Sequence, residues 1–86
     1  MKFSTKSRYA LRLVADLAIH RTDGVLRLKD VASRQNITEK YAEQIISMLK
    51  HGGLVQAKRG TQGGYTLTKP AAEITIGEIL RLTEGD

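Results

Sequence analysis

A pair of helices joined by a tight turn, predicted over residues 31–51, constrains the fold more than any other part of the chain. The first helix is short and has Val31 on its apolar side. Asn36 follows it, and asparagine is one of the few non-glycine residues that adopt the left-handed conformation ending many helices. Thr38 is then a suitable N-cap, and Glu39 puts a carboxylate in the first turn, where the helix dipole favours it. Two short helices meeting through a turn of about three or four residues indicate a helix-turn-helix.

The second helix of this pair has an apolar side and a polar side. Residues at helical spacing predict one buried stripe of Tyr41, Ala42, Ile45, Ile46 and Leu49. The opposite side carries only polar residues, namely Glu39, Lys40, Glu43, Gln44, Ser47 and Lys50. Lys50 and His51 fall in the last turn, and Gly52 is placed to cap it. Because the second helix of a helix-turn-helix enters the DNA major groove, the polar side of residues 38–50, from Thr38 to Lys50, is expected to face bases.

The length and charge of the chain limit its organisation and its partners. With 86 residues it has room for one domain with one small core. Residues 1–59 hold 12 Lys and Arg against 5 Asp and Glu, a balance of +7, and residues 60–86 hold 2 against 4, a balance of −2, which together give the net charge of +5. This asymmetry favours contact with a polyanion, although ordinary solvating charge gives the same totals.

Two absences narrow the class of protein further. There is no cysteine, which excludes disulfides and thiolate metal sites within these residues and is compatible with a cytoplasmic protein. No apolar run approaches the roughly 20 residues that span a membrane, and the charged start lacks the apolar region of a secretory signal. We therefore expect a cytoplasmic protein with no membrane partner.

A first helix is predicted over residues 6–21, with basic residues near its start. Three hydroxyl residues offer N-caps: Ser4, Thr5 and Ser7. Its expected core stripe follows the helical period through Ala10, Leu13, Val14, Leu17 and Ala18. The helix dipole disfavours cations at an N-terminus, so Lys2, Lys6 and Arg8 indicate a surface that meets phosphate, with a merely solvated helix end as the alternative. For Tyr9 two roles stay open, which are packing and a hydrogen bond to a backbone phosphate.

Two strands are predicted after the helix pair, over residues 54–58 and 65–68. The connection between them is rich in glycine and carries Arg59. Strand, basic loop and strand directly after a helix-turn-helix describe a winged helix-turn-helix, mainly α with a small antiparallel hairpin. Arg59 at the base of the wing suits a minor groove, where narrow A·T tracts concentrate negative potential. The loop lacks the G-x-x-x-x-G-K-[ST] pattern, so no nucleotide site is expected.

Two further elements complete the single domain predicted over residues 1–86. Residues 25–27 are too few for more than a minor edge strand. A last helix is expected near Thr75, which forms a capping box with Glu78, while Ile74 packs on Ile79 as a hydrophobic staple.

Several motifs make the chain resemble a known family. They are S-T-K-S-R-Y-A-L at residues 4–11, Y-A-E-Q at residues 41–44, G-L-V-x-x-x-R-G-x-x-G-G-Y at residues 53–65 and I-T-I-G-E-I at residues 74–79. In order and nearly without gaps, the chain resembles the N-terminal domain of the bacterial IscR/NsrR/CymR regulators, the Rrf-two family. The resemblance implies a dimeric winged-helix regulator of transcription, with Glu43 and Gln44 on the base-reading face and Arg59 in the wing contact.

The family's cofactor does not carry over to these residues. Cluster-binding members of the family have three cysteines, and then a long dimerisation helix, just beyond the region that this chain matches. The 86 residues contain no cysteine, so we expect no iron–sulfur cluster held by their thiolates and assign no cofactor. The chain is either a fragment of a longer protein or a minimal member, and a homodimer is expected where the full architecture is present.

The residues expected to contact double-stranded DNA divide by their chemistry. Glutamine pairs with adenine through two hydrogen bonds, a carboxylate accepts from the cytosine amino group, and lysine suits guanine or a phosphate. The expected base-reading residues are Lys40, Glu43 and Gln44. The expected contacts to the DNA backbone or the minor groove are Lys2, Lys6, Arg8, Tyr9, Arg34, Lys50, Lys58, Arg59 and Gly60.

The sequence therefore predicts a sequence-specific DNA-binding regulator, with repression as the expected mode of control. The alternative is a winged helix that binds proteins, which should show an exposed apolar patch in place of the polar, basic surface. An enzyme is not expected, because there is no cysteine nucleophile and His20 and His51 each fall at a predicted helix end. RNA binding is disfavoured because the tyrosines are too spread along the chain to form a stacking platform.

Overall fold

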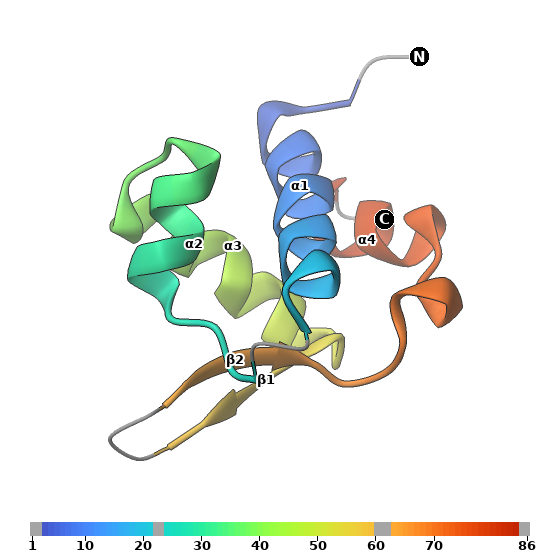
Figure 1. The fold of residues 1–86 in the computed structure, drawn as a ribbon. Coiled ribbons are helices and arrows are strands. Elements are labelled where there is room, and N and C mark those ends of the chain that lie inside the picture. The colour runs from blue at the N-terminus through green and yellow to red at the C-terminus, as the bar shows by residue number, and fades with distance from the viewer. Residues whose placement is uncertain (1–2, 22–23, 60–62, 85–86) are drawn as a thin grey trace.

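The computed structural model of the chain, which describes residues 3–21, 24–59 and 63–84, is a group of packed helices with a small hairpin along one edge (Figure 1). The elements in chain order are α1 (Thr5–Ile19), α2 (Leu28–Gln35), α3 (Glu39–His51), β1 (Val55–Lys58), β2 (Gly64–Leu67), the short 3-10 helix η2 (Ala71–Glu73) and α4 (Ile76–Glu84). The prediction of a mainly helical chain with one antiparallel hairpin is confirmed.

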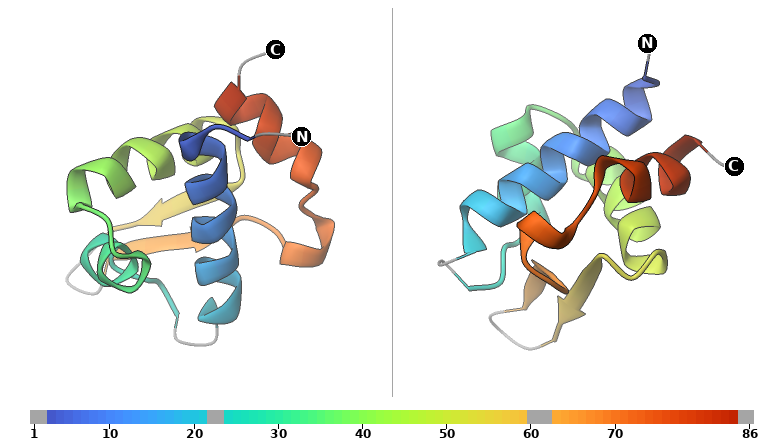
Figure 2. Two further views of the ribbon diagram at one scale, coloured as in Figure 1. Left: turned by 90° about the horizontal axis from the view of Figure 1, so that it is seen from above. Right: turned by 90° about the vertical axis from the view of Figure 1, so that its right-hand side faces the viewer.

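The core forms where the other helices pack on α1. This helix contacts α2 and α3 as well as α4, and Figure 2 shows it crossing the centre of the molecule. The predicted stripe of α1 is confirmed at Ala10, Leu13, Val14 and Leu17, while Ala18 is half-buried. The apolar side chains buried around it are Leu26, Val31, Ala32, Ala42, Ile45, Ile46, Leu49, Leu54, Val55 and Ile79. Burial of this set is the main stabilising contribution that the described residues offer.

The turn between α2 and α3 is set by the backbone of one residue. Asn36 has φ 57° and ψ 47°, which is the left-handed conformation that the sequence predicts for it. The Asn36 N–H donates to the Ser33 carbonyl oxygen at 3.2 Å, and the Ile37 N–H donates to the Ala32 carbonyl oxygen at 3.0 Å. This pair of bonds is a Schellman motif, which satisfies the last carbonyls of α2 and turns the chain toward α3.

The end of α3 uses the same motif, and Gly52 caps the helix as the sequence predicts. Gly52 is the C-cap with φ −81°, whereas Gly53 adopts the left-handed conformation with φ 81°. The Leu54 N–H donates to the Leu49 carbonyl oxygen at 3.0 Å and so closes the motif. Gly52 has a different constraint, because a Cβ there would overlap the side chain of Leu82 in α4.

The wing is a hairpin that is joined to the segment before α2. Strands β1 and β2 pair antiparallel, with Val55 opposite Leu67 and Lys58 opposite Gly64. Residues 25–27 supply one isolated bridge, in which the Leu26 N–H donates to the Tyr65 carbonyl oxygen at 2.9 Å and the Tyr65 N–H donates to the Leu26 carbonyl oxygen at 2.8 Å. The minor edge strand predicted there is therefore a single bridge, and it ties the wing to the helical part of the fold.

The last helix begins as predicted, but its capping box is only half formed. The Glu78 N–H donates to Thr75 Oγ1 at 3.0 Å, as an N-cap requires. The Glu78 carboxylate accepts instead from Lys69 Nζ at 3.3 Å. Ile79 is buried and Ile74 is half-buried against the core, consistent with the predicted staple.

We predict that Gly64→Ala destabilises the fold by about 1–3 kcal/mol, the range typical of overpacking. A Cβ at Gly64 would lie 2.5 Å from the Leu26 carbonyl oxygen, and this oxygen belongs to the backbone of the bridge. Gly77→Ala, in α4, is the matched control. Its Cβ would meet nothing closer than 3.8 Å, and helix propensity favours alanine over glycine. Urea denaturation measures both, and equal stability of Gly64→Ala and wild type would contradict the packing argument.

Candidate nucleic-acid interface

One side of α3 is exposed and polar along its whole length. All six polar residues predicted there are exposed, namely Glu39, Lys40, Glu43, Gln44, Ser47 and Lys50. The predicted apolar stripe faces inward, with Ala42, Ile45, Ile46 and Leu49 buried and Tyr41 half-buried. Thr38 caps the helix as predicted, because its Oγ1 accepts from the Tyr41 N–H at 3.0 Å. The helix therefore presents side chains that form hydrogen bonds, and none of them is needed by the core.

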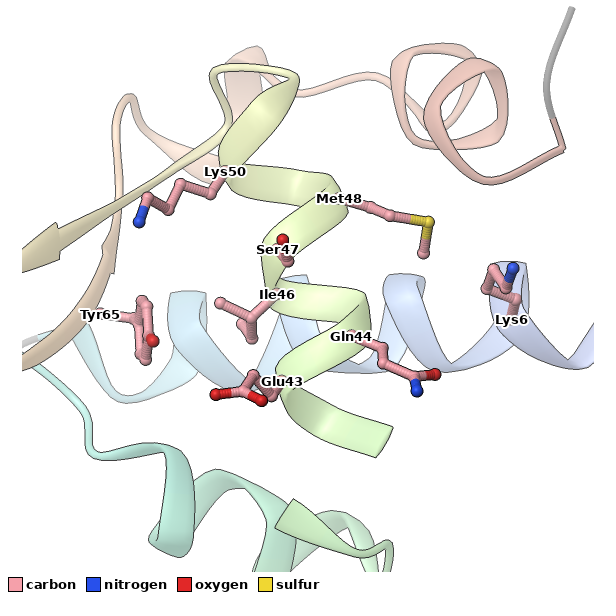
Figure 3. A pocket seen from close by; sticks show the side chains of 8 residues that line it. All are labelled: Lys6, Glu43, Gln44, Ile46, Ser47, Met48, Lys50 and Tyr65. Carbon is pink, nitrogen blue, oxygen red and sulfur yellow. The ribbon is translucent and has the colours of Figure 1, made fainter. Parts of the chain in front are cut away.

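A shallow open pocket lies over this side of α3, between the start of α1 and the wing. Its lining residues come from α1, α3 and β2 and are Lys6, Glu43, Gln44, Ile46, Ser47, Met48, Lys50 and Tyr65. Figure 3 shows Lys6 beyond Gln44 on one side of α3, and Lys50 and Tyr65 on the other side. The polar side of α3 is thus flanked by the first turns of α1 and by the hairpin.

Basic residues on the flanking elements are exposed to solvent. Lys6 and Arg8 are exposed in α1, and Lys58 and Arg59 are exposed at the end of β1. Two further predicted contacts, Lys2 and Gly60, lie outside the residues that the structure describes. The exposed cations therefore come from elements on both sides of α3, which is an arrangement suited to two strands of phosphates.

Tyr9 packs between α1 and α3. Its ring meets the ring of Tyr41 edge to face, with centroids 5.7 Å apart and planes at 82°. The guanidinium carbon of Arg12 lies 4.5 Å from the Tyr9 centroid, within the range of a cation–π interaction. Of the two roles that the sequence leaves open for Tyr9, the structure shows packing.

Arg34, predicted as a phosphate contact, forms an ion pair with Asp16 of the same chain. Its Nη2 donates to Asp16 Oδ1 at 2.7 Å and its Nε donates to Asp16 Oδ2 at 3.0 Å. Gln35 Nε2 adds a third bond to Asp16 Oδ2 at 2.9 Å, while Gln35 Oε1 accepts from Arg12 Nε at 2.9 Å. These contacts join the end of α2 to the middle of α1, so Arg34 has a structural use that competes with binding phosphate.

The surroundings of Asp16 act on its pKa in opposite directions. Burial raises the pKa of this carboxyl, since Asp16 is only 4% exposed. The hydrogen bonds from Arg34 and Gln35 lower it, as does the positive charge of Arg34, and the net pKa lies below the usual value of 3.8. Asp16 is therefore charged at neutral pH and stabilises the fold in that state.

The anion at the start of α1 is a side chain of the protein itself, the carboxylate of Glu84. The sequence predicts that this basic helix end meets phosphate. In the structure Ser4 Oγ donates to the Glu84 carboxylate at 2.6 Å, and the Ser7 hydroxyl donates to the same oxygen. The contacts of Asp16 and Glu84 were both missed from the sequence, because each depends on residues distant along the chain.

The chain is similar to bacterial transcriptional regulators over nearly its whole length. Residues 3–86 match the Rrf2 family, described as an iron-dependent transcriptional regulator. The chain is 44% identical over 85 residues to the HTH-type transcriptional regulator CymR of Bacillus subtilis (strain 168), which covers 99% of this chain and 62% of CymR. It is 41% identical over 80 residues to the HTH-type transcriptional regulator IscR of Photorhabdus laumondii, covering 93% of this chain and 49% of IscR.

Solved structures agree with the fold. The structure of CymR, titled the global cysteine regulator of B. subtilis, has a TM-score of 0.93 at 42% identity and covers 100% of this chain and 67% of that one. The structure of T. potens IscR has a TM-score of 0.91 at 44% identity and covers 99% of this chain and 62% of that one. The chain thus spans between about half and two thirds of the length of these relatives.

The residues present do not by themselves fit an iron site. The 86 residues contain no cysteine, so no thiolate is available as a ligand. In the described ranges no group of three or more histidine, aspartate and glutamate side chains is placed to hold a metal ion. None of the helices described is long and apolar enough to cross a membrane.

We predict that Asp16→Asn destabilises the fold by about 1–3 kcal/mol at pH 7, because Arg34 and Gln35 then lose a charged acceptor. Since folding lowers the pKa of Asp16, the wild type itself loses this contribution as the pH falls from 3.8 through the value in the folded state. The difference in unfolding free energy between the two proteins should therefore be smaller at pH 3 than at pH 7. Asp30→Asn, at an exposed aspartate of α2, is the control, and a difference independent of pH would contradict the charged role.

Proposed function

Because the chain belongs to the Rrf2 family of transcriptional regulators, we propose that it binds double-stranded DNA at specific sequences and represses transcription. The observation that carries this proposal is the exposed polar side of α3, flanked by basic residues of α1 and the wing. In a helix-turn-helix of this kind α3 enters the major groove, and the wing with Arg59 reaches an adjacent minor groove.

Base reading falls to three residues on the first half of α3. Gln44 offers an amide that pairs with adenine through two hydrogen bonds, and Glu43 accepts from the amino group of cytosine. Lys40 suits guanine. All three side chains are exposed, and Glu43 and Gln44 also line the pocket over α3. A carboxylate at this place is repelled by phosphates, so Glu43 is more useful for selecting bases than for general affinity.

Contacts to the DNA backbone fall to the exposed cations around α3. Lys6 and Lys50 line the same pocket as Gln44, and Arg8 and Lys58 are exposed on the flanking elements. They would neutralise phosphates and fix the register of the protein without reading sequence. We assign Tyr9 and Arg34 to the support of α3, since their contacts lie within the protein. Lys2 and Gly60 keep their predicted roles as backbone or minor-groove contacts.

The rival function, binding to a protein partner, is less well supported by the surface of α3. Among the described residues the exposed large hydrophobic side chains are Ile19 and Ile76, which are 74% and 59% exposed. Ile19 ends α1 and Ile76 begins α4, so neither belongs to the polar side of α3. An apolar patch is therefore not what α3 presents, whereas polar and basic groups are.

We further propose that the whole protein acts as a homodimer in the bacterial cytoplasm, without a cofactor held by these 86 residues. The resemblance to dimeric members of the family supports the dimer. A dimer would place two copies of α3 on half-sites about one helical turn of DNA apart.

We predict that Lys6→Ala and Arg59→Ala each weaken binding to every duplex and lower the slope of log K against log salt by about one unit, because each removes one phosphate contact. Fluorescence anisotropy with a random duplex at several salt concentrations measures this. Arg21→Ala is the matched control, since this exposed arginine lies with Pro70 and Ala72 at the opposite end of α1. Binding that is absent or insensitive to salt, in a sample shown to be dimeric, would favour the protein-binding function.

We predict that Gln44→Ala costs about 1–3 kcal/mol on the preferred site and relaxes the base preference there, because a bidentate contact to one base is lost. The preferred site is first selected from a random duplex library with the wild type. Competition between the selected site and a scrambled duplex then gives the specificity ratio. Equal weakening on both duplexes would show that Gln44 does not read a base.

A further inference from the structure

We propose that Glu84 is a positioning residue for DNA binding, because its carboxylate holds the first turn of α1 and thereby fixes Lys6 beside α3. This inference rests on the proposed function. Lys6 is the proposed phosphate contact that Glu84 holds in place, so the end of α4 has a role in the affinity for DNA.

The contact joins the two ends of the described chain. One carboxylate oxygen of Glu84 accepts from the Ser4 N–H at 3.2 Å, from Ser4 Oγ at 2.6 Å and from the Ser7 hydroxyl. The Ser7 hydroxyl also lies 2.7 Å from Thr83 Oγ1, and Ser7 is fully buried. Both views in Figure 2 place the start of α1 beside the end of α4. The last turn of α4 is thus bonded to the first turn of α1 across about 80 residues of sequence.

The carboxylate supplies what the first turn of α1 lacks. No acidic residue lies in this turn, although the helix dipole favours one, and Lys6 places a cation there. Ser4 Oγ accepts from the Ser7 N–H at 3.1 Å as the N-cap and at the same time donates to Glu84. Hydrogen bonds from Ser4 and Ser7 lower the pKa of Glu84, which agrees with a carboxylate that is charged where it binds.

The same turn carries the proposed phosphate contact. Lys6 lies between Ser4 and Ser7 in sequence, and it lines the pocket over α3 with Gln44 and Met48 (Figure 3). Ser4 and Ser7 hold the side of the turn that meets α4, so Lys6 is set on the side that meets α3. Without the carboxylate the first turn would fray, as helix ends do when a cap is lost, and Lys6 would no longer be held near a phosphate.

Two variants separate positioning from plain charge. Glu84→Gln removes the negative charge but keeps an oxygen that accepts hydrogen bonds, whereas Glu84→Ala removes both. If Glu84 only repelled DNA, both variants would bind DNA more tightly. If it positions Lys6, Glu84→Ala should bind every duplex several-fold more weakly and lower the salt slope by about one unit, while Glu84→Gln, which keeps the acceptor oxygen but loses the charge, binds between Glu84→Ala and the wild type. Glu73→Ala removes an equal charge from η2, at the other end of α1, and is the control.

The test is a mutant cycle in the whole protein, by fluorescence anisotropy on selected and random duplexes. Glu84→Ala should weaken binding in the wild-type background but add nothing in the Lys6→Ala background, because both changes remove one contact. The preference for the selected duplex should stay constant in every variant. Full additivity of the two substitutions, tighter binding by both Glu84 variants, or wild-type affinity of Glu84→Ala would each overturn the inference.

A second readout needs no DNA. Amide hydrogen exchange at Ser7 and Arg8 should become faster in Glu84→Ala than in wild type or Glu84→Gln, since these N–H groups belong to the turn that the carboxylate holds. Unchanged exchange would overturn the positioning role. Failure of the wild type to bind any duplex would instead count against the proposed function, so the two failures are distinguishable.

Discussion

The buried carboxylate of Asp16 fixes the direction in which the helix-turn-helix leaves the core. It lies in the middle of α1 and holds Arg34 and Gln35, the last two residues of α2, through three hydrogen bonds of 2.7 to 3.0 Å. Because α2 then ends at Asn36 in a fixed left-handed turn, the start of α3 is determined by the same contacts. A single charged group in α1 therefore orients the helix that is proposed to read bases, and apolar packing alone would leave this angle less specific.

The helix α1 connects the helical parts of the proposed interface. Its middle holds α2 through Asp16, its second turn packs on α3 through Tyr9 and Tyr41, and its first turn is bonded to Glu84 of α4. The wing is attached separately, by the bridge between Leu26 and Tyr65. None of these contacts uses the exposed side of α3. A ligand can therefore bind to that side without disturbing the contacts that hold the elements together.

The parts of the fold that follow from local chemistry could be predicted, and the parts that follow from tertiary contacts could not. Asn36 and Thr38 act through their own backbone preference and their own side chain, so their roles were predictable from neighbours in sequence. Gly52 was likewise predictable as the C-cap of α3, whereas the choice of Gly53 as the left-handed residue was not, because two adjacent glycines are locally equivalent. Asp16 and Arg34 are 18 residues apart, so their pairing depends on which helix faces meet. The sequence did hold one signal of this pairing, because Asp16 is a charged residue among the apolar residues of the predicted first helix.

Under the proposed function, selectivity for a DNA sequence and affinity for DNA come from different elements. On the polar side of α3 the carboxylates of Glu39 and Glu43, which phosphates repel, offset the charges of Lys40 and Lys50, so this helix alone is a weak source of attraction. Affinity must then come mainly from cations on α1 and the wing, such as Lys6 and Arg59. Screening limits the attraction between a cation and a phosphate to about 10 Å at moderate salt. A cation therefore contributes only if the fold holds it close to the DNA backbone when α3 is in the groove. In this proposal, the contacts that hold α1, α3 and the wing together determine how strongly the protein binds DNA, and α3 determines at which sequence.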